Sequence, residues 1–388
     1  MKYKLSDLFE LQMGKTPSRD NTEYWSQPEY PWVSIADLSG AGKYIYATKE
    51  SISRLAIEES GIKTIPANTV IMSFKLSIGK VSITPIPMYS NEAIMAFIDK
   101  GITTIKPEYL YYLLLHRDWD EGTNKAVMGK TLNKATLSDV VIDVHSIEDQ
   151  DRIVAVLDKV SDIIERYQKQ LNTLDILVKA RFIEMFGEPR LNPHDYPVHQ
   201  LSEHIQFLTS GSRGWAQYCV DDGKEWFITI KNVKDCHIST ANMQAINAPD
   251  NAEAKRTRVE EGDLLISITA DLGRTGVVTQ EIAEHGAYIN QHLTCIRLNR
   301  KVLEPLYVAY FMESAAGKEQ FVSKNQSAVK AGLNFNSINT LQILIPPIEI
   351  QQQFLRFVSQ VDKSKVVVQK ALDEAKLLFE SLMQKYFG

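Results

Sequence analysis

The chain has 388 residues, of which 44% are hydrophobic and 23% are charged, a composition typical of a soluble globular protein with two or three domains. No apolar run reaches the roughly 18 residues of a membrane-spanning helix, and the N-terminal residues lack the apolar core of a signal peptide. Cys219, Cys236 and Cys295 lie far apart, which indicates free thiols in a reducing, cytoplasmic compartment. The net charge of −5 excludes a surface coated with positive charge, although a local basic groove could still bind nucleic acid.

Residues 1–147 show the pattern of a mixed α/β domain. Short β-rich runs occur at 32–35, 69–74 and 93–98, and an aromatic stretch of helical character follows at 109–116. Turn residues separate the runs, as they do between the strands of a compact domain. We therefore predict one β-rich domain with a helical part near its end.

Residues 148–187 are predicted to form one long helix. The stretch has no internal proline or glycine, so the helix could extend unbroken for about 60 Å at 1.5 Å per residue. Its apolar residues are spaced alternately by four and by three, which is the heptad seam of a coiled coil. The seam residues are Ile153, Leu157, Val160, Ile164, Tyr167, Leu171, Leu174 and Val178.

The second half of the chain begins with a linker and another domain, which together occupy residues 188–348. The linker at 188–197 is rich in proline, which keeps it extended and non-helical. Residues 226–230, 263–268 and 293–298 are again β-rich, and the sequence from Leu306 to Glu313 is again helical in character. A second mixed α/β domain is the simplest prediction.

Residues 349–388 are predicted to form a second long helix with the same seam. Only Lys365 interrupts its apolar positions. The other seam residues are Phe354, Val358, Val361, Val368, Leu372, Ala375 and Phe379.

An internal repeat relates the two halves of the chain. An offset of 201 residues aligns Phe186-Gly187 with Phe387-Gly388, and Gln150 with Gln351. Such self-similarity indicates two copies of one structural unit. We predict two domains separated by two long antiparallel helices that form a coiled coil, with pseudo-twofold symmetry. Burial of each helix in its own domain is the alternative.

The search for catalytic motifs finds none. Asp250, Glu253 and Lys255 lie too close together for a nuclease core, and Gly79-Lys80 lacks the other residues of a Walker A loop. His194 and its two neighbours at intervals of five residues do not have the spacing of a metal site, so surface histidines are the preferred interpretation. We expect neither a catalytic residue nor a metal site.

Four clusters of polar residues recur in both domains and are predicted to contact DNA. Small-residue loops with hydroxyls and cations suit phosphate binding, and amide side chains suit hydrogen bonding to adenine. Ordinary turns and strand capping are the alternatives. The first domain contributes Lys15, Thr16, Ser18, Arg19, Lys75, Ser77, Lys80, Asn91, Lys125 and Lys130. The second contributes Ser212, Arg213, Thr269, Arg274, Asn290, Gln291, Lys324 and Lys330.

Taken together, these features resemble the specificity (S) subunit of type I restriction–modification systems, and the resemblance covers the whole chain. Its motifs are Leu-Ser-Asp-Leu-Phe at 5–9, Gly-Lys-Thr-Pro-Ser at 14–18, the Ile-Glu-x-Gln starts of both helices, their Phe-Gly ends and the linker. The loop of the second domain departs from the pattern because it lacks Thr-Pro.

The resemblance implies a division of labour. Residues 1–147 and 188–348 would each contain a target-recognition domain that reads one half of a bipartite, asymmetric DNA site, while helices 148–187 and 349–388 would act as spacers. The helices would also dock two methyltransferase (modification) subunits, and restriction/translocase subunits would complete the complex. The chain itself would be non-catalytic and bind no cofactor. S-adenosylmethionine, ATP and magnesium would belong to the partner subunits.

Two other functions remain open at this point. A specificity protein from another phage-defence system would have the same sequence features. A coiled-coil scaffold that binds only proteins would explain the helices, but not the recurring loops with hydroxyls and cations.

Overall fold

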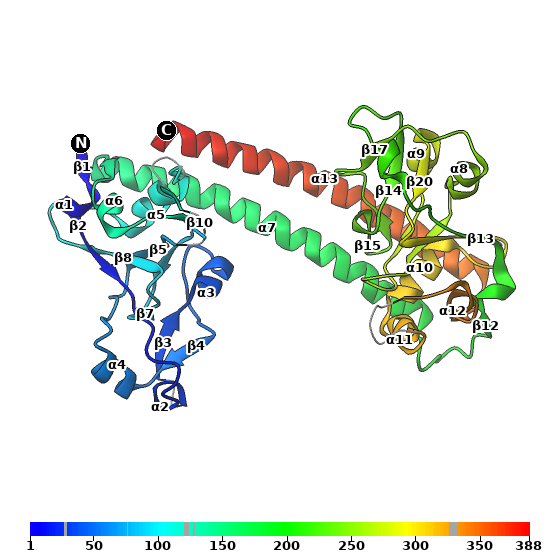
Figure 1. Ribbon diagram of the computed structural model, residues 1–388, viewed down its shortest axis with the longest axis horizontal. Helices are drawn as coiled ribbons and strands as arrows, with labels where there is room; N and C mark the ends of the chain where they lie inside the picture. Colours follow the sequence, from blue (N-terminus) through cyan, green and yellow to red (C-terminus); the bar gives the residue numbers. More distant parts are fainter. Residues whose placement is uncertain (27–28, 76, 120–123, 127–128, 326–331) are drawn as a thin grey trace. The chain divides into compact units, whose positions relative to one another are not determined.

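The computed structural model describes residues 1–388 apart from 27–28, 76, 120–123, 127–128 and 326–331. The chain forms two compact units (Figure 1). Unit 1 contains Met1–Gln168 together with Lys370–Gly388, and unit 2 contains Lys169–Gln369. Each unit therefore holds one globular domain and one half of each long helix. Within the described residues, no helix is long and apolar enough to cross a membrane.

The globular part of unit 1 is built on two small sheets. Four strands form an antiparallel sheet in the order β2-β8-β5-β6, and three form a second sheet in the order β4-β3-β7, in which β3 runs parallel to β7. The strands are β1 (Lys2–Lys4), β2 (Phe9–Met13), β3 (Tyr30–Val33), β4 (Glu50–Ile52), β5 (Thr69–Ser73), β6 (Val81–Thr84), β7 (Tyr89–Ser90), β8 (Ile94–Asp99), β9 (Asn124–Ala126), β10 (Gly129–Thr131) and β11 (Val141–Asp143). The helices are α1 (Leu5–Leu8), α2 (Glu23–Ser26), α3 (Ile35–Gly40), α4 (Arg54–Ser60), α5 (Pro107–His116), α6 (Lys134–Ser138) and α7 (Ile147–Phe186).

Strand β5 is apolar at its centre, residues 70–72, where both of its faces are buried. Val70 and Met72 belong to the large core cluster that includes α5, whereas Ile71 packs with Val33 and Leu38 on the other face. A strand between two buried layers has a continuous apolar run instead of an alternating pattern. The four-stranded sheet is therefore the central layer of unit 1.

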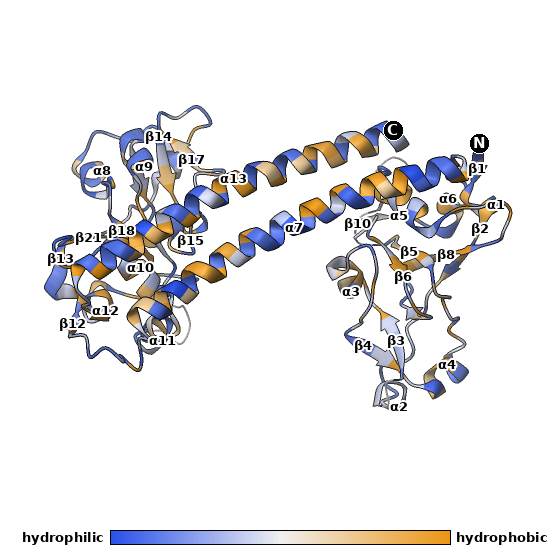
Figure 2. Ribbon diagram, turned by 180° about the vertical axis from the view of Figure 1, so that it is seen from behind, coloured by the Kyte–Doolittle hydropathy of each residue, from blue (hydrophilic) through white to orange (hydrophobic). Residues whose placement is uncertain are grey.

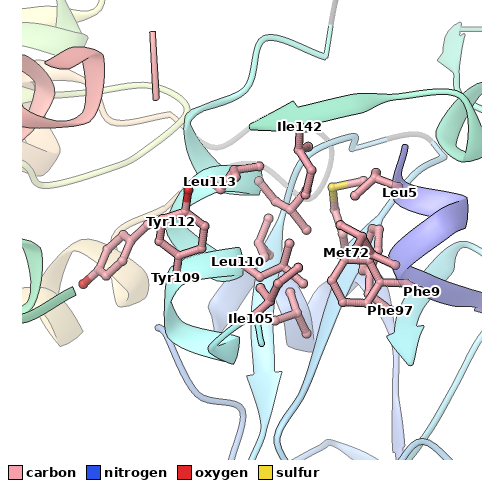
Figure 3. Packing of buried hydrophobic residues seen from close by; sticks show 14 of the residues in the cluster. Leu5, Phe9, Met72, Phe97, Ile105, Tyr109, Leu110, Tyr112, Leu113 and Ile142 are labelled. Atoms are coloured by element: carbon pink, nitrogen blue, oxygen red, sulfur yellow. The ribbon is translucent and has the colours of Figure 1, made fainter. Parts of the chain in front are cut away.

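Aromatic residues of α5 form the centre of the larger cluster. Tyr109, Leu110, Tyr112 and Leu113 of this helix lie opposite residues of the sheet such as Met72 (Figure 3). The cluster also contains residues from both long helices, at the beginning of α7 and the end of α13 (Ile348–Phe387). They include Ile153, Leu157, Phe379, Leu382, Met383 and Phe387.

Unit 2 repeats this architecture with different strands. Its sheets have the orders β13-β21-β18-β19 and β17-β14-β20. The strands are β12 (Val198–Gln200), β13 (Ile205–Ser210), β14 (Glu225–Ile228), β15 (Val233–Lys234), β16 (His237–Ile238), β17 (Gln244–Ile246), β18 (Leu264–Ser267), β19 (Thr275–Val277), β20 (Ala287–Ile289), β21 (Leu293–Leu298) and β22 (Gln342–Leu344). The helices are α8 (Ala252–Thr257), α9 (Gln280–His285), α10 (Pro305–Glu313), α11 (Ala315–Ser323), α12 (Phe335–Asn339) and three 3₁₀ turns, η1 (Leu201–His204), η2 (Trp215–Tyr218) and η3 (Ile230–Asn232).

The two long helices exchange roles between the units. In unit 2 the end of α7 and the beginning of α13 pack on α10, and Phe186 lies 4.7 Å from Tyr307 between ring centroids. In unit 1 the end of α13 takes the corresponding place, and Phe387 lies 5.5 Å from Tyr109. The mixed α/β fold with two long helices and an internal repeat, as predicted from the sequence, is confirmed. Each domain contacts segments of both helices, so neither helix is buried in its own domain alone.

The seam residues that were predicted to form the interface are buried or half-buried. Hydrophobic and hydrophilic residues alternate along both ribbons (Figure 2). Lys365, which interrupts the apolar seam, forms an ion pair with Asp175 of α7 at 2.5 Å between Nζ and Oδ1. The buried predicted interface residues are Ile153, Leu157, Val160, Phe354, Val358, Val361 and Leu372, and the half-buried ones are Ile164, Leu171, Leu174 and Phe379.

Each globular domain also contacts a long helix through charged side chains. In unit 1, Lys43 Nζ lies 2.5 Å from Asp158 Oδ1 of α7. In unit 2, His237 Nε2 lies 3.2 Å from Asp362 Oδ2 of α13, and its Nδ1 lies 2.7 Å from the Asp235 carbonyl oxygen. The hydrogen bond to Asp362 is the main cause that raises the pKa of His237 above 6.5, although burial opposes it.

The cation of this contact is a lysine in unit 1 and a histidine in unit 2, so only the contact of unit 2 should depend on pH between about 6 and 8.5. Because the folded-state pKa of His237 is raised, its stabilising effect should be complete below about pH 6.5 and be lost as the pH rises through the folded pKa. The melting temperature of wild type should therefore exceed that of His237→Gln at pH 6, and the difference should shrink by pH 8.5. Asp158→Asn, which removes the lysine contact of unit 1, should destabilise equally at both pH values. A His237→Gln effect that does not change with pH would contradict this assignment.

Candidate nucleic-acid interface

The polar clusters of unit 1 lie at one edge of its four-stranded sheet. Because neighbouring strands are antiparallel, the ends of β2 and β5 lie at the same edge as the beginnings of β8 and β6. The register agrees, since Met95 of β8 pairs with Met13 of β2 on one side and with Met72 of β5 on the other. The loops that leave this edge, 14–19, 74–80 (without 76) and 91–93, are termed the edge loops of unit 1.

Unit 2 gathers the corresponding clusters in the same way. Thr294 of β21 pairs with Ser210 of β13 and with Ile266 of β18, which places the adjoining loops at one edge. These loops, 211–214, 268–274 and 290–292, are the edge loops of unit 2. Three of the four clusters that the sequence identified in each domain are therefore neighbours in space.

In both units a backbone hydrogen bond holds the first edge loop to the strand that precedes the third loop, β7 or β20. In unit 1 the Lys15 amide donates to the Ser90 carbonyl oxygen at 2.8 Å, and in unit 2 the Ser212 amide donates to the Ile289 carbonyl oxygen at 3.1 Å. Ser212 is thus the structural counterpart of Lys15. Its side chain is only 3% exposed, so the prediction that it contacts DNA does not fit its buried position.

The second edge loop has an identical turn in both units. Ser73 accepts a hydrogen bond at its hydroxyl from the Lys80 amide at 3.1 Å, and Ser267 accepts one from the Arg274 amide at 2.8 Å. Gly79 and Gly273, with φ values of +82° and +74°, complete these turns against aromatic side chains. The recurring glycines therefore have a structural role in the turn, which presents Lys80 and Arg274 at the same place.

The two asparagines keep their loops in shape. Asn91 Oδ1 accepts a hydrogen bond from the Ala93 amide, and Asn290 Oδ1 accepts one from the His292 amide, both at 3.1 Å. This is the capping role that the sequence left as an alternative. Bidentate recognition of adenine requires both the oxygen and the nitrogen of the amide. In this conformation Oδ1 of each asparagine already accepts one hydrogen bond from the backbone.

Several predicted cations already have partners within the chain. Arg19 makes two hydrogen bonds to Glu50, and its guanidinium lies 3.8 Å from the centroid of the Trp25 ring. Arg274 is paired with Asp271. Lys15 donates to the Ser60 carbonyl oxygen. Lys80 is exposed. Lys75 lies over the Phe74 ring, with a distance of 5.2 Å from Nζ to the ring centroid.

The remaining predicted residues are distributed around the same loops. Thr16 donates a hydrogen bond to Glu92, and Thr269 is hydrogen-bonded to His292. Lys324 donates to Thr340 at 3.0 Å. Ser18, Ser77 and Arg213 are exposed and Gln291 is half-buried. Lys125 and Lys130 pair through the backbone of β9 and β10, but their side chains lie outside the described residues, as does the whole of Lys330.

Two further residues at the edge were not among the predicted DNA contacts. Glu92 belongs to the third loop and faces the other two. The hydrogen bond from Thr16 is the main cause that lowers the pKa of Glu92, and the charge of Lys75 adds to the effect. Arg256 of α8 donates to the Ser210 carbonyl oxygen at 2.7 Å and so adds a cation to unit 2. No local pattern marks Arg256, because α8 reaches this edge only through the tertiary fold.

Within the described ranges, no group of three or more His, Cys, Asp or Glu residues could hold a metal ion. The edge loops instead combine exposed cations, hydroxyls, amides and backbone amide groups, which are the groups that bind phosphates and base edges.

The sequence matches the model of the type I restriction modification DNA specificity domain over residues 1–175 and 223–375. The chain belongs to this family. The resemblance that its motifs predicted is thereby confirmed.

Two relatives show the extent of the similarity. The type I restriction enzyme MjaIX specificity subunit of Methanocaldococcus jannaschii is 25% identical over 409 residues, which cover 98% of this chain and 91% of that protein. The EcoBI specificity subunit of Escherichia coli is 22% identical over 295 residues, which cover 69% of this chain and 61% of that protein.

Solved structures share the fold. A chain from a study of the complex assembly and conformational transition of a type I restriction–modification system matches with a TM-score of 0.60 and 17% identity, covering 100% of this chain and 97% of that one. The specificity subunit from M. genitalium matches with a TM-score of 0.58 and 13% identity, covering 100% and 96%.

The close contact between edge loops makes a prediction about two glycines. A Cβ atom at Gly14 would lie 2.2 Å from the Asn91 carbonyl oxygen, and one at Gly211 would lie 1.9 Å from that of Asn290. Gly14→Ala and Gly211→Ala should therefore each destabilise the protein by about 1–3 kcal/mol or more, as overpacking does. Chemical denaturation measures this loss. Gly40→Ala is the control, because a Cβ atom there meets nothing within 4 Å. Equal stability of all three variants would contradict the tight packing of the loops.

Proposed function

We propose that the protein is the DNA-recognition subunit of a type I restriction–modification complex, and that it reads a bipartite, asymmetric site with one domain for each half. The observation that carries this proposal is the recurrence of the edge loops. Two copies of one loop framework present different side chains, as an asymmetric pair of half-sites requires.

The differences fall at equivalent positions. Lys15 of unit 1 corresponds to the buried Ser212 of unit 2, and the exposed Lys80 corresponds to Arg274, which is paired with Asp271. The turns that recur in both units keep the loops in place, while these changes alter the charge and the hydrogen-bonding groups offered to DNA. Family membership supports the same proposal, because the matching family is a DNA specificity domain.

Partner docking is proposed for the exposed apolar residues of the long helices. Ile176 and Leu177 on α7 are exposed, and the residues at the equivalent positions of α13, Leu377 and Leu378, are exposed as well. Exposed apolar surface of this kind marks protein interaction sites. Two equivalent surfaces on one chain suit two copies of the same partner, so we propose that each binds one methyltransferase subunit.

The chemistry of the complex is proposed to reside in these partners. The chain would act as a non-catalytic subunit, with S-adenosylmethionine bound by the methyltransferase subunits and ATP and magnesium by restriction/translocase subunits. The site of action would be the cytoplasm, where the DNA is. A coiled-coil scaffold without DNA recognition would leave the two sets of edge loops without a role.

The two-reader arrangement predicts separable half-site specificities. Asn91→Asp keeps the oxygen that caps the loop but replaces the Nδ2 donor, and Asn290→Asp does the same in unit 2. Each variant should change base preference in one half-site only, by roughly 1–3 kcal/mol for a lost base contact. Selection of bound sequences from a random library, with the assembled complex, measures this preference. A change in both half-sites from either variant, or one continuous site for wild type, would contradict the proposal.

The two docking surfaces predict a stepwise loss of partners. Ile176→Ser with Leu177→Ser should remove one of two methyltransferase subunits, and Leu377→Ser with Leu378→Ser should remove one as well. The mass of the purified complex measures the stoichiometry.

Val366→Ser with Val367→Ser is the matched control for docking. These two valines are equally exposed on α13, but the equivalent residues of α7 are Glu165 and Arg166, so they form no repeated surface. The control should retain two partner subunits. Retention of both partners by all three double variants would exclude docking at the proposed surfaces.

A further inference from the structure

A fully buried glutamine lies in the first turn of each long helix. Gln150 of α7 and Gln351 of α13 both have a relative exposure of 0%. A buried carboxamide requires partners for all its hydrogen-bonding groups. The two residues occupy equivalent positions of the repeat, and their contacts can be compared directly.

In unit 1 the carboxamide of Gln150 connects three backbone groups. Its Oε1 accepts a hydrogen bond from the Lys106 amide at 2.9 Å, and its Nε2 donates to the carbonyl oxygens of Thr104 and His145 at 3.0 and 3.1 Å. Lys106 is the residue that caps the N-terminus of α5. Gln150 thus joins the beginning of α5, the beginning of α7 and the segment that precedes α7.

In unit 2 the same set of contacts recurs. Gln351 Oε1 accepts from the Glu304 amide at 2.9 Å, and its Nε2 donates to the carbonyl oxygens of Val302 and Pro346 at 2.9 and 2.8 Å. Glu304 caps α10 as Lys106 caps α5. The repetition of all three hydrogen bonds in domains whose other residues differ indicates that the contact has a function beyond filling space.

The residue type is suited to orienting one element on another. The surrounding seam residues, such as Ile153, pack through contacts that are not directional. Hydrogen bonds weaken steeply when their angle changes, so three of them fix an orientation that apolar packing leaves free to shift. Glutamic acid of the same shape would place an oxygen against two carbonyl oxygens, and methionine would leave all three backbone groups without partners.

We propose that Gln150 and Gln351 are positioning residues that fix the angle between each recognition domain and its long helix, and thereby restrict the complex to one spacing between half-sites. This inference rests on the proposed function. In this role the glutamines contact no DNA. They act through the helix start and the first turn of α5 or α10, whose aromatic residues belong to the domain core.

The test is the distribution of half-site spacings selected from a random DNA library. Wild type should select one spacing over its neighbours by at least about tenfold, which corresponds to about 1.4 kcal/mol. Gln150→Met should reduce this ratio below about threefold, while the base preference within each half-site stays the same. Gln351→Met should broaden the spacing in the same way. Gln150→Glu, which keeps the acceptor for the Lys106 amide, serves as the milder variant if Gln150→Met does not fold.

A control separates orientation from general stability. Val70→Ala in β5 removes apolar packing from the same core cluster without touching the glutamine. It should lower the melting temperature but leave one sharp spacing.

A folded Gln150→Met or Gln150→Glu variant with the wild-type spacing ratio would overturn the inference, as would a Val70→Ala variant that broadens the spacing equally. Selection of no bipartite site by wild type would instead contradict the proposed function itself.

Discussion

The structure depends on apolar packing between each domain and two helix segments that come from different copies of the repeat. In unit 2, Phe186 at the end of α7 lies against Tyr307, and in unit 1, Phe387 at the end of α13 lies against Tyr109. Burial of such aromatic side chains contributes strongly to stability. Because the second helix segment comes from the other copy, the core of neither unit is complete with its own repeat alone.

Hydrogen bonds and charged contacts add directional interactions between each domain and the helices. The buried glutamines Gln150 and Gln351 tie each helix start to the cap of α5 or α10. Lys43 and His237 tie the outer part of each domain to a helix by charged contacts. The edge loops then take their positions from the ends of the central sheet. A recognition surface built in this way can change its side chains without changing the framework that holds it.

The sequence allowed the prediction of elements with strong periodicity. Both helices were predicted because steps of four and three persist along them, and the edge clusters were found because they recur in both halves. Their meeting at one sheet edge required the strand order, which no local pattern reveals. The pairing of Arg19 with Glu50, the burial of Ser212 and the place of Arg256 depend on tertiary contacts between distant segments. Whether the predicted residues bind DNA stays a prediction.

The most direct test of this account lengthens both helices together. Seven residues that keep the heptad pattern would be inserted after Gln168 and after Gln369, where the two units meet along the chain. One heptad adds about 10.5 Å of helix, which corresponds to about three base pairs of B-DNA. Library selection with the assembled complex should then report a half-site spacing about three base pairs longer, with unchanged half-sites. An unchanged spacing in a folded, DNA-binding variant would contradict the account.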